Sequence, residues 1–201
     1  MVVFKSKICS KPNCRIPAWT QTNFCITHHP DTSGRARFLT RDLLDGDLIR
    51  DSADWSGANL SGEDLSGREF RYCRFSGTNF TDADLTGTRF LMCLLDGVVA
   101  PGARFGGCRM MSVMAAGADF EKAVFSGCDL INVNFNGIMA EHAVFDGSDL
   151  FYSRFISARL QNAMIRDCNL KRVDFTAAVL DGVDFSDSNP EESYLGTGEF
   201  E

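Results

Sequence analysis

Long apolar runs are missing from this 201-residue chain. The longest, FLMCLL at positions 90–95, has six residues, whereas a membrane-spanning helix needs about 18 or more. The first ten residues, MVVFKSKICS, do not read as a targeting signal, because their apolar run is too short. We therefore expect no membrane association and a place in the reducing cytoplasm.

Basic residues are also scarce. The chain has 20 Lys and Arg against 27 Asp and Glu, a net charge of −7, and no basic residue follows Arg172. Domains that bind nucleic acid usually carry a basic face that neutralises phosphates, so direct nucleic-acid binding is not expected. The charge is uneven, with +3 on residues 1–52, −6 on 53–187 and −4 on 188–201, which indicates different neighbours at the two ends.

A period of five residues dominates the middle of the chain. From Trp55 to Phe185 every fifth position is a centre, 27 in all, and Phe or Leu occupies 21 of them. The position two before the centre is Ala, Cys, Val, Ser or Thr in 24 quintets, and the position two after it is Gly in 13. Neither a helix nor a simple strand has this period, so each quintet is predicted to be a short extended side plus a corner. The centre and the small residue before it should point inward, while Gly suits a corner with positive φ.

The pattern A(D/N)LxG, seen in ANLSG at 58–62, resembles the pentapeptide repeat family, and the resemblance covers 135 of the 201 residues. It implies an all-β fold, a right-handed quadrilateral β-helix in which four quintets make one coil. Like side chains then stack in columns every 20 residues. The sequence divides into a small N-terminal module at 1–34, a connecting or capping segment at 35–52, the repeats at 53–187 and an acidic tail at 188–201.

Three centres are Ala rather than a large residue: Ala100, Ala115 and Ala140. A β-branched residue two positions earlier partly restores the inward volume in each case. The alternative is a local bulge that turns the residue just before the centre inward, which would bury Val99, Met114 and Met139.

The eight cysteines fall into two groups. Five occupy the small inward position and are interpreted as buried small hydrophobic residues: Cys73, Cys93, Cys108, Cys128 and Cys168. The other three lie in CSKPNCRIPAWTQTNFCITHH, at 9–29. A close Cys pair followed one loop later by Cys and His is the pattern of a tetrahedral structural zinc site. The predicted Zn²⁺ ligands are Cys9, Cys14, Cys25 and His28, with His29 as the alternative fourth ligand.

Residues 36–50 allow two interpretations. Phe38, Leu43 and Leu48 are again five apart, which favours extra quintets joined to the main register by a two-residue slip; the alternative is a short capping helix. At the other end, Tyr194 and Leu195 are candidates to dock over the last coil.

No set of side chains for catalysis is evident. His142 is isolated at an outward position, the Ser and Asp residues are explained by the repeat, and no Gly-rich loop precedes a helix. We therefore expect a binding protein and not an enzyme.

One outward column carries large apolar residues. The position after the centre holds Leu91, Met111, Ile131 and Phe151 at intervals of 20, flanked by Met92 and Tyr152. A contiguous apolar surface usually marks a partner site, so these six residues are predicted to bind a protein partner or a second copy of the chain. The alternative is that the N-terminal segment or the acidic tail of the same chain covers them.

The family resemblance implies a second function. Known members protect or inhibit type II topoisomerases such as DNA gyrase, where an acidic rod takes the place of DNA. Glu121 and Glu141 share an outward column, as do Asp129 and Asp149, but arginines interrupt the acidic columns. DNA mimicry is therefore the alternative to the interaction scaffold.

Overall fold

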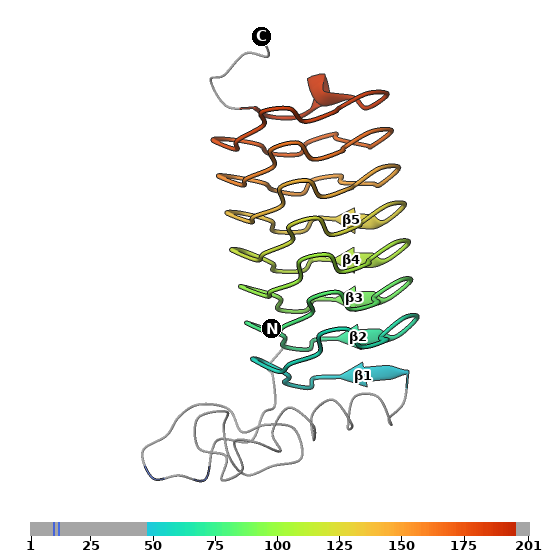
Figure 1. Cartoon of the computed structure of the whole chain (residues 1–201), viewed down its shortest axis with the longest axis vertical. Helices are drawn as coiled ribbons and strands as arrows, with labels where there is room; N and C mark the ends of the chain where they lie inside the picture. Colours follow the sequence, from blue (N-terminus) through green and yellow to red (C-terminus); the bar gives the residue numbers. More distant parts are fainter. Residues whose placement is uncertain (1–9, 11, 13–47, 196–201) are drawn as a thin grey trace.

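The computed structural model describes residues 10, 12 and 48–195. Residues 48–195 form a parallel β-solenoid, drawn as a stack of coils in Figure 1. Each coil takes 20 residues, because backbone pairs join residues 20 apart from Ile49↔Glu69 to Asp174↔Tyr194. The fold predicted from the period of five is confirmed as an all-β parallel solenoid, and its right-handed sense stays a prediction.

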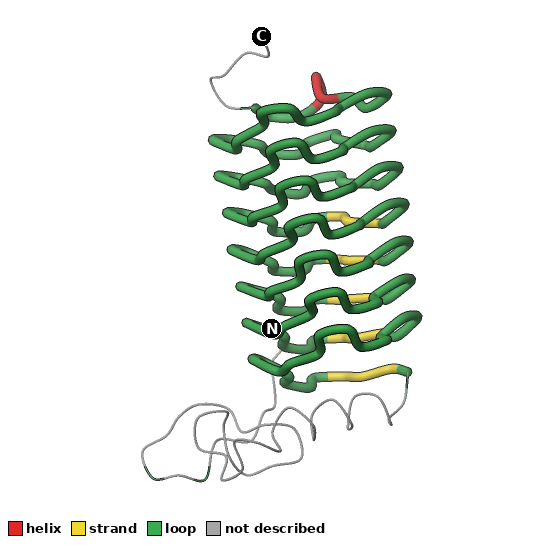
Figure 2. The backbone as a smooth tube through the Cα atoms, in the orientation of Figure 1, coloured by secondary structure: helices red, strands yellow, loops and turns green. Residues whose placement is uncertain are grey.

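One side of the solenoid carries regular strands. They are β1 (Ile49–Asp51), β2 (Glu69–Arg71), β3 (Arg89–Leu91), β4 (Arg109–Met111) and β5 (Asp129–Ile131), which pair in that order as one parallel sheet. The rest of each coil consists of turns joined by single bridges (Figure 2). A short 3-10 helix, η1 (Pro190–Glu192), lies at the C-terminal end.

The predicted centres form the core. All of them from Trp55 to Phe175 are buried, while Leu180 and Phe185 at the last coil are partly buried. The three Ala centres are fully buried, and Val99, Met114 and Met139 are 39–41% exposed. The bulge alternative is therefore wrong, because the buried β-branched residues fill the inward volume beside each Ala: Val98, Val113 and Ile138.

Asp or Asn before the centre has a structural role that explains the motif A(D/N)LxG. Its side-chain oxygen accepts a hydrogen bond from the backbone N–H two residues later, as in Ser66 N–H to Asp64 at 2.9 Å and Thr86 N–H to Asp84 at 3.0 Å. This Asx turn replaces a backbone contact at the corner. Eleven residues do this in the described part of the chain: Asp54, Asn59, Asp64, Asn79, Asp84, Asp119, Asn134, Asp149, Asn169, Asp174 and Asp184.

Polar residues at the small inward position bond to the preceding coil. The hydroxyl of Ser153 donates to the carbonyl of Leu130 at 2.6 Å, and the thiol of Cys128 donates to that of Phe105 at 3.0 Å. Each of these donors reaches the centre 23 residues earlier, and the hydroxyls of Thr78 and Thr88 make the same contact. Burial raises the pKa of the Cys168 thiol to about 11 and also raises that of Cys108. The five cysteines of the repeats are buried, as their small inward position predicts.

The two ends of the solenoid extend the repeat beyond the regular quintets. At the N-terminal end Arg50 pairs with Phe70, so the main register already holds in β1, and Leu48 is 64% exposed. This exposure argues against Leu48 as the inward centre of an extra quintet, and Phe38 and Leu43 lie outside the described residues. At the C-terminal end Tyr194 pairs with Asp174, and Leu195 packs against the core as expected.

Candidate partner-binding site

The predicted apolar column lies along one corner of the solenoid. Leu91 ends β3, Met111 ends β4 and Ile131 ends β5, and the paired strands place these three side by side. A bridge between Leu94 and Met114 places two more apolar residues in a parallel column across the corner. We define the apolar edge as these residues with their flanking partners: Leu91, Met92, Leu94, Met111, Met114, Ile131, Phe151 and Tyr152.

The apolar edge is open to solvent in the described structure. Met92, Met111 and Met114 are 45%, 42% and 40% exposed, and Tyr152 is 53% exposed, while Leu91, Ile131 and Phe151 are half-buried. The rings of Phe151 and Tyr152 lie 6.2 Å apart. The structure thus brings together all six residues predicted for partner binding, and adds Leu94 and Met114. Sequence reasoning missed these two as site members because they stand one column further, across the corner.

The corner itself is unusual in its backbone. All seven described corner residues that follow the strand side have positive φ, yet none is Gly: Ser52, Tyr72, Met92, Ser112, Asn132, Tyr152 and Arg172. Each of the other three corners contains at least three glycines. A side chain at positive φ costs about 1 kcal/mol or more. Eight non-Gly residues at positive φ also occur on the other corners, so this corner differs from them in having no Gly at all among its described residues.

Several outward acidic residues form ion pairs with basic residues. Asp129 pairs with Arg109 at 2.6 Å and Glu141 with Arg159 at 2.7 Å. The Arg166 guanidinium pairs with Asp146 and holds the pKa of that carboxyl below its usual range. The acidic columns are therefore interrupted by ion pairs between coils and do not form a continuous negative stripe.

The predicted zinc ligands, Cys9, Cys14, Cys25, His28 and the alternative His29, lie outside the described residues. Within the described part, no group of three or more His, Cys, Asp or Glu side chains is placed to hold a metal ion. No helix among residues 10, 12 and 48–195 is long and apolar enough to cross a membrane.

Family models for pentapeptide repeats match two stretches of the chain. The pentapeptide repeat region matches residues 118–195, and a model of eight pentapeptide copies matches residues 51–87. These stretches span 78 and 37 residues, together 115 of 201. The chain belongs to the pentapeptide repeat family. The match to residue 195 agrees with the pairing of Tyr194, which continues the solenoid beyond the last regular quintet.

Solved structures of pentapeptide repeat proteins share the fold. HetL, involved in heterocyst differentiation regulation in the cyanobacterium Nostoc sp. strain PCC 7120, is 13% identical with a TM-score of 0.52, covering 78% of this chain and 92% of HetL. A trypsin-treated form of QnrB1, a plasmid-mediated fluoroquinolone resistance protein, is 23% identical with a TM-score of 0.54, covering 70% of this chain and 83% of QnrB1. At such identities the likeness concerns the fold alone. No curated protein sequence matches the chain.

Proposed function

We propose that this pentapeptide repeat protein is a non-enzymatic interaction scaffold, a rigid solenoid that binds a protein partner through the apolar edge. The observation that carries the proposal is the exposure of Met92, Met111 and Tyr152, at 45%, 42% and 53%, on a corner that has no glycine. Stacked coils hold these side chains at fixed spacing, so a partner meets a preformed surface and little ordering entropy is lost on binding.

The proposal includes a zinc-binding module at residues 1–34, with Cys9, Cys14, Cys25 and His28 or His29 as ligands. Its support is the spacing of these residues in the sequence. The zinc has a structural role in this proposal, because four protein ligands leave no open position for a substrate.

A matched pair of surface variants tests the apolar edge. In the first, Met92→Glu and Met111→Glu place charges on the edge. In the second, Val99→Glu and Met139→Glu change residues of similar exposure, 41% and 39%, in a column on another side of the coil. The wild type and both variants are used as bait in quantitative affinity capture, and their masses in solution are measured by light scattering.

If the protein is an interaction scaffold, the wild type and the control variant should capture a protein partner or self-associate. The edge variant should do neither. Both variants should unfold at the temperature of the wild type, because all four positions are exposed. If both variants retain, or both lose, the same protein and the same mass, the apolar edge is not the binding surface.

DNA mimicry is the second candidate function. Residues 48–195 hold 21 acidic against 13 basic residues, and QnrB1 shares the fold. The ion pairs that interrupt the acidic columns argue against it. A DNA gyrase supercoiling assay with and without a fluoroquinolone separates the candidates. The scaffold predicts no inhibition of gyrase and no protection against the drug, whereas either effect would favour the DNA mimic.

A further inference from the structure

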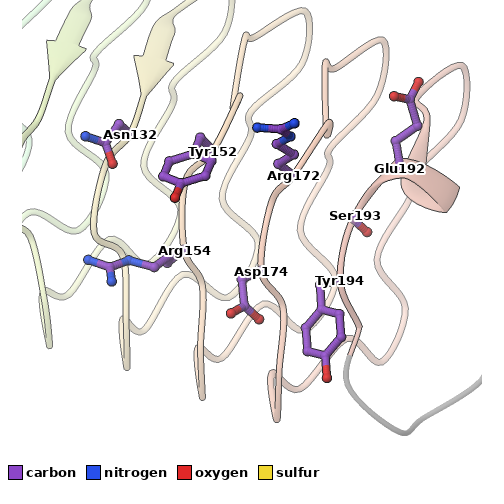
Figure 3. A pocket seen from close by; sticks show the side chains of 8 residues that line it. All are labelled: Asn132, Tyr152, Arg154, Arg172, Asp174, Glu192, Ser193 and Tyr194. Atoms are coloured by element: carbon purple, nitrogen blue, oxygen red, sulfur yellow. The ribbon is translucent and has the colours of Figure 1, made fainter.

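A groove of about 660 Å³ lies at the C-terminal end of the corner that carries the apolar edge (Figure 3). Asn132, Tyr152 and Arg172 form one wall from successive coils, all at positive φ. Arg154, Asp174 and Tyr194 form the facing wall from the next column. Figure 3 shows the two rows of side chains rising from parallel runs of chain.

The groove holds two guanidinium groups that have no acidic partner among residues 48–195. Nine other Lys and Arg side chains in this range form ion pairs with a carboxylate: Arg71, Arg74, Arg89, Arg104, Arg109, Lys122, Arg159, Arg166 and Lys171. Arg154 and Arg172 form none in the described structure, and both are exposed. The groove therefore holds two positive charges that no described carboxylate meets at ion-pair distance, although Asp174 and Glu192 also line it.

The two carboxylates that line the groove contact groups other than Arg154 and Arg172. The Oδ1 atom of Asp174 accepts the N–H and the hydroxyl of Thr176 at 2.9 and 2.5 Å. Glu192 accepts from Asn189 at 3.0 Å and lies 3.3 Å from the ammonium of Lys171. Neither carboxylate lies within ion-pair distance of Arg154 or Arg172, so the two guanidinium groups remain available to an anionic ligand.

Aromatic side chains complete the groove. Tyr152 and Tyr194 are 53% and 61% exposed, and each offers a flat ring together with a hydroxyl that can donate or accept a hydrogen bond. Tyr152 lines the groove and also belongs to the apolar edge, where its ring lies 6.2 Å from that of Phe151. The groove and the apolar edge are therefore adjacent.

The length of the groove favours a peptide over a single small anion. Asn132 and Glu192 both line the groove, and they lie three coils apart along the solenoid. At about 4.8 Å per step this is about 14 Å, the length of about four residues of extended peptide. A single phosphate or carboxylate fills only a fraction of this length.

We propose that the groove binds an extended acidic peptide segment, whose carboxylates pair with Arg154 and Arg172 while its backbone lies along Tyr152 and Tyr194. This proposal rests on the proposed function, because we assign the acidic segment to the same partner that covers the apolar edge. The partner then carries apolar residues followed by Asp or Glu.

Calorimetric titration with two synthetic peptides tests the groove. The first is acetyl-SEEGEES-amide, and the second, acetyl-SQQGQQS-amide, has the same shape without carboxylates. The wild-type full chain is compared with the double variant Arg154→Gln and Arg172→Gln. The control is Arg104→Gln with Arg159→Gln, which changes the net charge equally but removes arginines that already pair with Asp84 and Glu141.

The wild type is expected to bind the Glu peptide and not the Gln peptide. The groove variant should bind the Glu peptide about tenfold or more weakly, since it lacks the two guanidinium groups that donate charge-assisted hydrogen bonds to the carboxylates. The control variant should keep the wild-type affinity. Absence of binding to the wild type, equal binding of the Gln peptide, an equal loss in the control, or inorganic phosphate binding as tightly as the peptide overturns the proposal. The peptides have no apolar side chain, so a failure of the apolar edge leaves this readout unchanged.

Discussion

The rings of Phe105 and Phe125 stack face to face, with centroids 4.5 Å apart and planes 7° apart. Phe145 continues the stack at 5.0 Å and 3°. Phe125→Ala should lower the free energy of unfolding by about 3–5 kcal/mol, because it leaves a cavity between two rings. Phe125→Asp should prevent folding, since it buries a carboxylate in an apolar column. The outward neighbour Val124→Ala serves as the control in chemical denaturation. A folded Phe125→Asp protein with the wild-type melting curve would refute the register.

The run at 90–95 shows how much the sequence alone could predict. Phe90, Cys93 and Leu95 are buried, while Leu91, Met92 and Leu94 are not, as the period of five requires. The repeat therefore predicts which side chains face inward, and it placed the centre of the apolar edge. It says nothing of which charged side chains pair across coils. The Arg104 side chain forms an ion pair with Asp84 at 3.0 Å. The Arg154 side chain forms no ion pair with Asp174, although a backbone bridge joins these two residues just as it joins Asp84 and Arg104. Side-chain conformation decides this, so the groove could not be predicted.

Two substitutions at corner residues, one on the glycine-free corner and one on another corner, should change stability in opposite directions. Gly127 has a φ of +66°, with open space where a Cβ would stand, so Gly127→Ser should cost about 1–2 kcal/mol through backbone strain alone. Ser112 has a φ of +53°, and Ser112→Gly should gain up to about 1 kcal/mol, because relief of strain exceeds the added entropy of the unfolded chain. Chemical denaturation of both variants measures these differences. Equal losses in the two would contradict the assigned backbone strain.

Stability should fall at acid pH. The pKa of Asp146 is lowered by Arg166, and the pKa of Asp84 is lowered by its hydrogen bonds from Thr86 and by Arg104. A carboxyl whose pKa is lower in the folded state stabilises it above the unfolded pKa of about 3.9 and loses that contribution as pH falls through the folded pKa. The melting temperature should therefore be nearly constant from pH 7 to about 5 and fall below about 4. Asp146→Asn should make the fall shallower. A melting temperature unchanged down to pH 2 would contradict these shifts.

Zinc content tests the N-terminal module. Purified protein should contain about one zinc ion per chain, as a four-ligand structural site requires. Cys14→Ser should remove the metal, whereas Cys128→Ala should leave it in place, because Cys128 is buried in the solenoid. Separate His28→Ala and His29→Ala variants identify the fourth ligand by elemental analysis. Metal-free wild-type protein, purified without chelators, would exclude the module.

The apolar edge as a partner surface is the central claim, and site-specific photocrosslinking in cells tests it most directly. A photoreactive phenylalanine analogue replaces Met111 on the edge or, as control, Met139, which is similarly exposed in a column on another side of the coil. The scaffold predicts a discrete adduct with a second protein or a second copy of the chain from position 111 and none from position 139. No adduct from position 111, or the same adduct from both positions, would contradict the claim.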